Sequence, residues 1–154
     1  TSVLAKCDEG RCRDRIMCKE EMEYPLLARA RETLAEAELL AGSGFRFGAI
    51  NRLYYACFYA VTALLQMEGF SSHKHSGVIS LFDQHWIKPG RLPIAMGRFY
   101  RKLFELRHHG DYASMVPLEE AQLSDLLEEA RRFIEQVERA IHRGPPDVSQ
   151  EASP

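Results

Sequence analysis

Apolar residues recur every three or four positions through most of the chain, and this spacing restricts the fold more than any other feature. Between residues 117 and 143 one apolar stripe comprises Leu123, Leu127, Ala130, Ile134, Val137 and Ile141. This interval places the side chains on one face of an α-helix. No stretch alternates polar and apolar residues over enough positions to indicate a strand. The sequence therefore predicts an all-α fold.

Glycine and proline interrupt the apolar stripes and divide the chain into predicted helices. The interruptions fall at 42–44, 69, 89–90, 110 and 144–146. Between them we expect long helices at about 23–41, 47–68, 92–109 and 117–143, and a short helix at about 75–86. The expected buried stripes include Phe47 and Ile94, near the starts of two long helices. The predicted architecture is an up-and-down bundle of four long helices plus one short helix.

A chain of 154 residues is long enough for one domain with its own core. We place this helical bundle at 23–143 and expect a flexible tail at 144–154. Residues 1–21 carry five basic and five acidic residues with few apolar ones, which predicts that 1–22 is an N-terminal extension, disordered or not native to the chain. The start at Thr1 rather than Met indicates a trimmed or incomplete N-terminus.

The composition favours a cytoplasmic protein without a cofactor. No apolar run is long enough to span a bilayer, and the first thirty residues lack the apolar core of a signal peptide. Three cysteines, Cys7, Cys12 and Cys18, have no fourth zinc ligand near them in the sequence, so free thiols are favoured over a metal site.

Charge is distributed unevenly along the chain. Residues 45–112 carry nine Lys or Arg against four Asp or Glu, whereas residues 113–154 carry four against nine. The middle of the chain can therefore face an anion, while the acidic C-terminal part lies against a basic partner or against that middle.

The stretch FELRHHGDY at 104–112 is the strongest candidate site. Within one helical turn and a bend it gathers Arg107, His108, His109, Asp111 and Tyr112. A guanidinium binds phosphate bidentately and imidazole titrates near neutrality, so this group can bind or cleave a phosphodiester. The alternative is a helix C-terminus whose cations oppose the helix dipole, with Asp111 paired to Arg107.

Further candidate nucleotide or phosphate contacts lie on two other elements. Arg52 and Tyr55 share the aromatic face of the second helix, and Tyr55 can stack on a base, whereas its neighbour Tyr54 is expected in the core. Arg52 could instead hold the bundle together through an ion pair. Lys74 lies between His73 and His75 before the short helix. This segment could form an anion site at the helix N-terminus or supply half of a metal site. Without either, it is a solvated loop, which is the default interpretation.

Three segments in this order, NRLYYA at 51–56, SHKHSG at 72–77 and LRHHGDY at 106–112, resemble the prokaryotic HEPN domain family over roughly residues 23–142. The resemblance implies a homodimer in which the helices that carry the arginine motif face each other across a shared cleft. Many members look like RNases that need no metal. Many are encoded beside a small nucleotidyltransferase, which implies such a partner here.

The family's arginine falls on Arg107, but the histidine expected four to six residues later is displaced. This chain has His108 and His109 too early and Asp111-Tyr112 near the expected place, a variant that resembles a common subgroup. A rival register pairs Arg101 with His108 and leaves Asp111-Tyr112 unmatched.

Metal-free RNA cleavage needs a base, an acid and a cation at the phosphorus. Arg107 can be the cation and Asp111 a base, but a carboxylate also repels phosphate, by about 1 kcal/mol at ~4 Å in water. The leading hypothesis is therefore a HEPN-type bundle that binds a nucleotide or RNA phosphate in a dimer cleft. The alternatives are an active metal-independent endoribonuclease toxin and a structural adaptor.

Overall fold

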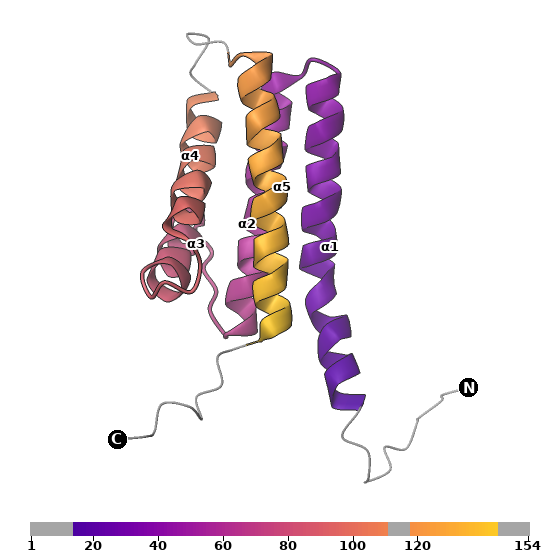
Figure 1. Cartoon of the computed structure of the whole chain (residues 1–154), viewed down its shortest axis with the longest axis vertical. Coiled ribbons are helices and arrows are strands. Elements are labelled where there is room, and N and C mark those ends of the chain that lie inside the picture. Colours follow the sequence, from indigo (N-terminus) through magenta and orange to yellow (C-terminus); the bar gives the residue numbers. More distant parts are fainter. Residues whose placement is uncertain (1–13, 111–117, 145–154) are drawn as a thin grey trace, which may run out of the picture.

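The computed structural model describes residues 14–110 and 118–144. They form helices α1 (Asp14–Gly42), α2 (Arg46–Met67), α3 (His75–Phe82), the π-helical turn η1 (Asp83–Ile87), α4 (Ile94–Gly110) and α5 (Glu120–Arg143). No strand occurs in these two segments. The prediction of an all-α bundle with four long helices and one short helix is confirmed (Figure 1).

Helix α2 is the central element of the bundle. It packs against α1, α3, α4 and α5, while α1 and α5 also contact each other. In Figure 1 the long helices stand side by side, with α5 in front of α2, α1 on one side and α4 on the other. Because α2 is covered by every other α-helix, its sequence is mostly apolar around the helix, as expected for a buried helix.

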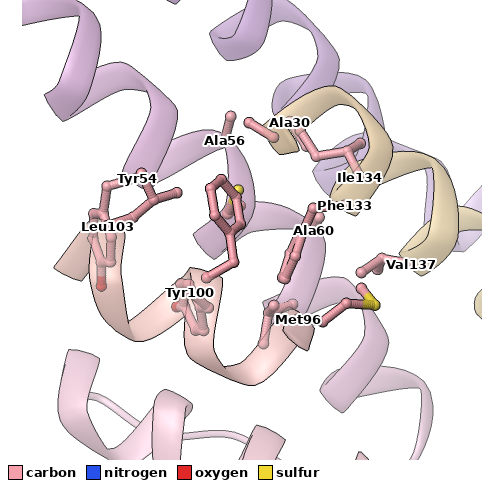
Figure 2. Close-up of a cluster of buried hydrophobic side chains, with 14 of the residues drawn as sticks. Ala30, Tyr54, Ala56, Ala60, Met96, Tyr100, Leu103, Phe133, Ile134 and Val137 are labelled. Carbon is pink, nitrogen blue, oxygen red and sulfur yellow. The ribbon is translucent and has the colours of Figure 1, made fainter. Parts of the chain in front are cut away.

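The core combines small residues on α1 and α2 with aromatic residues on α2, α4 and α5. Ala30, Ala56 and Ala60 are completely buried, and their small side chains let the helices approach closely. Around them lie the larger side chains of Tyr54, Met96, Tyr100, Leu103, Phe133, Ile134 and Val137 (Figure 2). The expectation that Tyr54 belongs to the core is confirmed, since its ring has no exposed surface.

Several predicted helix boundaries differ from the structure, and two of the predicted apolar stripes are exposed at one end. Helix α1 begins at Asp14, so its first turns lie in the segment that the composition assigned to an extension, and α5 begins at Glu120 rather than near 117. The predicted burial of Phe47 and Ile94 is wrong, because these side chains are 59% and 63% exposed. Both lie in the first turn of a helix, where the apolar stripe extends past the packed part of the bundle.

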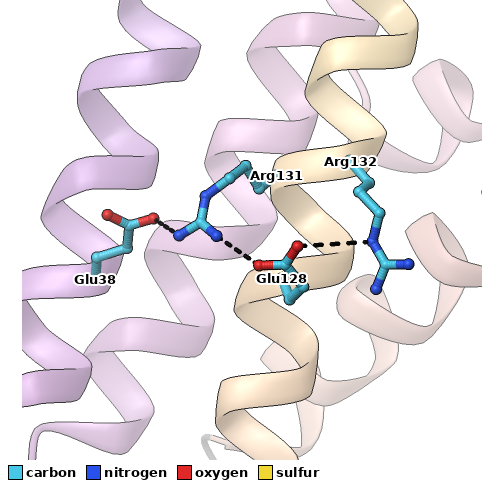
Figure 3. A network of polar contacts seen from close by, with 4 residues as sticks. All are labelled: Glu38, Glu128, Arg131 and Arg132. Atoms are coloured by element: carbon cyan, nitrogen blue, oxygen red, sulfur yellow. Dashed lines mark hydrogen bonds and ion pairs between the residues drawn. The ribbon is translucent and has the colours of Figure 1, made fainter.

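Helices α1 and α5 are joined on their outer face by an ion-pair network. Arg131 contacts Glu38 of α1 and Glu128 of α5, each at 2.5 Å, and Arg132 lies 4.0 Å from Glu128 (Figure 3). The Glu38 carboxylate raises the pKa of the Arg131 guanidinium. Side chains in this network are 40% to 65% exposed, so each pair stabilises the bundle by at most about 1 kcal/mol.

Helices in the described part of the chain are too short or too polar to cross a bilayer.

Candidate functional site

Arg107 lies in the last two turns of α4, against two tyrosines of α2. Its guanidinium carbon is 4.9 Å from the ring centre of Tyr54 and 4.8 Å from that of Tyr55. The side chain is half-buried, and among the described residues no carboxylate forms an ion pair with it. Cation–π contact with two rings fixes the face of the guanidinium without neutralising its charge.

His75, the first residue of α3, is the polar neighbour of Arg107. Its Nδ1 lies 3.3 Å from a terminal nitrogen of Arg107 and 2.8 Å from the Tyr54 hydroxyl. A guanidinium can only donate, so Nδ1 accepts in this contact and neutral His75 carries its proton on Nε2. Burial lowers the pKa of His75, and the charges of Arg107 and His108 lower it further. The imidazole is therefore neutral at neutral pH.

The position of His75 is set by ring stacking and by a tight loop. Its ring stacks on Phe58 at 4.6 Å between ring centres and meets Tyr55 edge-on at 5.8 Å. The preceding loop folds back so closely that a Cβ at Gly77 would lie 2.1 Å from the Ser72 hydroxyl oxygen. Only glycine fits at that position, and the close approach fixes where α3 begins.

Tyr54 and Tyr100 form the buried floor of the site. Their rings stack at 5.9 Å with an interplanar angle of 10°. Burial raises the pKa of Tyr54, although Tyr100 and Arg107 oppose that shift, and burial also raises the pKa of Tyr100 well above its usual value. Both phenols therefore stay protonated at physiological pH.

Arg52 extends the cationic surface along α2. Its guanidinium carbon is 5.1 Å from the ring centre of Tyr55, on the same ring that Arg107 contacts. It also contacts Asn51 at 3.0 Å and Glu36 of α1 at 3.5 Å. Arg52 is therefore ion-paired to another helix, as the structural alternative expected, and its contact with a nucleotide or phosphate stays a prediction.

The profile of the HEPN domain family matches residues 24–140. The chain belongs to the HEPN family.

Curated relatives support this assignment over most of their length. A "UPF0332 protein" of Thermotoga maritima is 42% identical over 113 residues, which are 73% of this chain and 86% of the relative. A "UPF0332 protein" of Gloeobacter violaceus is 38% identical over 73% of this chain and 90% of the relative. A protein of Methanocaldococcus jannaschii named "Putative toxin MJ0605" is 31% identical over 80% of this chain and 90% of the relative.

The other predicted site residues of this HEPN chain are less closely grouped. Lys74 is exposed and precedes α3, and His108 is exposed with its ring 4.5 Å from that of Phe104. The side chain of His109 and both residues of Asp111-Tyr112 lie outside the described part of the structure. Within that part, no three His, Cys, Asp or Glu side chains are grouped closely enough to hold a metal ion.

The histidine that contacts Arg107 is His75, 32 residues before it, whereas the HEPN resemblance led us to expect a histidine after Arg107. The expectation of a solvated loop does not hold for His75, which is half-buried and hydrogen-bonded. The signal was available, because His75 stands beside the glycine of the SHKHSG segment at the start of an apolar helix. The contact of His75 with Arg107 of α4 could not be predicted, because the two residues are 32 positions apart in the sequence.

Proposed function

We propose that this HEPN protein is of the toxin type and binds the phosphate of RNA or of a nucleotide at Arg107. The observation that carries the proposal is a half-buried guanidinium without an ion-pair partner among the described residues, held by two tyrosine rings and His75. Relatives named as toxins that align with 80% of this chain support the same class.

The geometry suits a phosphate oxygen. The tyrosine rings cover the face of the Arg107 guanidinium, and its edge carries N–H groups that match phosphate geometry. Neutral His75 has one more N–H donor, at Nε2, while its acceptor Nδ1 is occupied by Arg107 and Tyr54. A bound phosphate would therefore meet charge-assisted hydrogen bonds, each stronger than those between neutral groups.

The proposal includes a homodimer cleft around Arg107 and a small nucleotidyltransferase as partner, as the HEPN resemblance implies. Three aromatic side chains, Tyr55, Phe58 and Tyr59, remain partly exposed on α2 beside the site. Aromatic residues are enriched at protein interfaces, so a second copy can cover this face. Sedimentation equilibrium across a concentration series tests the dimer, and a monomer at all concentrations contradicts it.

RNA binding by purified variants tests the phosphate site. Fluorescence anisotropy with a labelled single-stranded RNA should give at least about tenfold weaker binding for Arg107→Ala, since a hydrogen bond to a charged group contributes about 1.5–3 kcal/mol. Arg132→Ala on α5 removes the same charge from a side chain that is 65% exposed, and it should bind within about twofold of wild type. Equal loss in both variants would contradict a site at Arg107.

RNA cleavage is the second candidate function, because His75 supplies the titratable group that is displaced from the α4 motif. When a phosphate engages Arg107 and the Tyr54 hydroxyl turns away from Nδ1, the lone pair of Nδ1 can accept the 2′-hydroxyl proton while Arg107 stabilises the phosphorane. The roles of Asp111 and Tyr112 as acid or base stay predictions.

Incubation with RNA in EDTA tests this second function. We expect cleavage that is lost in His75→Asn and retained in His73→Asn, which changes an exposed histidine two residues away. Binding without cleavage in the wild type would leave phosphate binding as the function and exclude the nuclease reading.

A further inference from the structure

A concavity lies between α1 and α2, beside the proposed phosphate site. It has a volume of about 300 Å³, at the lower end of the range for small-molecule sites. One stripe of α1 and two residues of α2 line it: Pro25, Ala28, Arg29, Glu32, Thr33, Glu36, Arg52 and Tyr59. The positions on α1 follow helical spacing, so the groove runs along a single face of that helix.

This groove is continuous with the Arg107 site through shared side chains. Arg52 lines the groove and also lies over the Tyr55 ring, whose centre is 4.8 Å from the Arg107 guanidinium carbon. The ring centre of Tyr59, another lining residue, is 6.1 Å from that of Tyr55. A ligand with its phosphate on Arg107 can therefore extend along α2 into the groove.

The groove combines an aromatic platform with both hydrogen-bond donors and acceptors. Arg29 lies over the Tyr59 ring at 4.8 Å, and Arg29 and Arg52 donate. Glu32 and Glu36 accept, and among the described residues Glu32 has no hydrogen-bond or ion-pair partner. Two carboxylates disfavour a second phosphate here, whereas a nucleobase edge presents both donors and acceptors and its rings stack on aromatic or guanidinium planes.

The free carboxylate favours one base over the others. Guanine carries two adjacent N–H donors, at N1 and at the exocyclic amine, which match the two oxygens of one carboxylate. Adenine offers a single amine beside an acceptor nitrogen, which a carboxylate repels. Ala28 has the small side chain that leaves room for a ring next to Tyr59.

We propose that the α1–α2 groove is a nucleobase subsite that selects an unpaired guanine next to the phosphate bound at Arg107. This inference rests on the proposed function, in which Arg107 binds the phosphate of RNA or of a nucleotide. It assigns the neighbouring groove to the base that is attached to that phosphate. Glu32 reads the donor edge of the base, Tyr59 and Arg29 support its rings, and Arg52 links the two sites.

Binding of nucleosides, which lack a phosphate, tests the groove independently of Arg107. In NMR titrations wild type should bind guanosine at least about fivefold more tightly than adenosine, since a good bidentate contact discriminates bases by about 1–3 kcal/mol. Glu32→Gln should reduce this preference to less than about threefold, and Ala28→Leu, which fills the groove, should abolish binding of both nucleosides. Glu135→Gln, an exposed change on α5, is the matched control and should keep the preference.

The outcomes separate this inference from the proposed function. If Arg107→Ala loses RNA but keeps guanosine within about twofold, both hold. If RNA binding depends on Arg107 while guanosine and adenosine bind equally, or not at all, the base subsite is overturned and the phosphate site stands. If guanosine binding depends on Glu32 while RNA ignores Arg107, the phosphate site is overturned and the groove stands. Circular dichroism melting of each variant excludes unfolding as the cause of lost binding.

Discussion

Arginines lie on both outer faces of the bundle, and their neighbours differ in kind. On the α1–α5 face, Arg131 is surrounded by the carboxylates of Glu38 and Glu128 at 2.5 Å (Figure 3). On the α2–α4 face, Arg107 lies on the rings of Tyr54 and Tyr55 and contacts the imidazole of His75, with no carboxylate paired to it among the described residues. The first guanidinium is neutralised within the fold, and the second is fixed in position with its charge uncompensated.

This difference distinguishes an arginine that joins helices from one that is available to a ligand. A paired and exposed arginine contributes little to stability and offers no net charge to an anion. An arginine held by aromatic faces keeps both its charge and its N–H edge, so its conformational entropy is already partly lost before a phosphate arrives. The absence of a carboxylate partner, together with the contacts to two rings and His75, therefore supports the proposed phosphate site at Arg107.

Charge reversal gives the largest expected contrast between the two faces. Arg107→Glu should weaken RNA binding by about 100-fold or more, because a charge-assisted contact of about 1.5–3 kcal/mol is lost and a like charge is added. Arg131→Glu makes the same change of charge and should alter affinity by less than about threefold, apart from a modest loss of stability from the adjacent glutamates. Fluorescence anisotropy at fixed salt measures both, and similar losses would abolish the distinction.

Removing the aromatic support should have an intermediate effect. Tyr55→Leu leaves the charge of Arg107 and Arg52 but deletes the ring that both contact, so we expect RNA affinity to fall by about threefold to tenfold, from a cation–π contribution of about 0.5–2 kcal/mol. Tyr55→Phe, which keeps the ring, should bind like wild type. A loss in the phenylalanine variant would assign the effect to the hydroxyl group instead.

The imidazole makes the α2–α4 face sensitive to pH, in a direction set by its lowered pKa. The folded state binds the His75 proton more weakly than the unfolded state, so stability is full above the unfolded pKa of about 6.5 and declines as pH falls toward the folded pKa. His75→Asn keeps a hydrogen-bond acceptor near Nδ1 and should flatten this decline. Thermal melting between pH 7.5 and 5 tests it, and identical pH profiles would exclude His75 as the titrating group.

The smallest effect is expected for the neutralised arginine itself. Arg131→Ala should lower the free energy of unfolding by less than about 1 kcal/mol, and added salt should diminish the difference, because the pairs are exposed. Urea denaturation at low and high salt measures it. A loss of several kcal/mol would show that this network holds the bundle together, contrary to the comparison.

The sequence was sufficient for the helices and for the residue at the centre of the site. Helical spacing and glycine breaks located every helix, because burial of one face determines both pattern and structure. Arg107 was singled out by the charged stretch at 104–112 and by the resemblance to the HEPN motif, and its role stays a prediction. The start of α1 was less accurate, because the residues from 14 to 22 are mostly charged and carry no apolar stripe. Burial was overestimated in the first turns of α2 and α4, where Phe47 and Ile94 are exposed.

Contacts between distant segments were beyond the reach of the sequence. No spacing rule relates His75 to Arg107, because their contact depends on how α3 and the loop before it, which approaches Gly77, lie against the rest of the bundle. The groove was missed for a similar reason. Its α1 residues read as an ordinary solvated face, and only the approach of Arg52 and Tyr59 from α2 makes them a concavity.

The central place of α2 has a consequence for how the site can be regulated. Tyr54 in the core and Tyr55 at the surface are neighbours on a helix that every other α-helix contacts, so amide protons there should exchange with solvent only when the whole domain unfolds. The part of α2 that carries Tyr54 and Tyr55 should therefore not unfold locally while the rest of the domain stays folded. We therefore expect an inhibitor of the proposed site to block or chemically modify the exposed edge of Arg107, because partial unfolding of α2 should not occur.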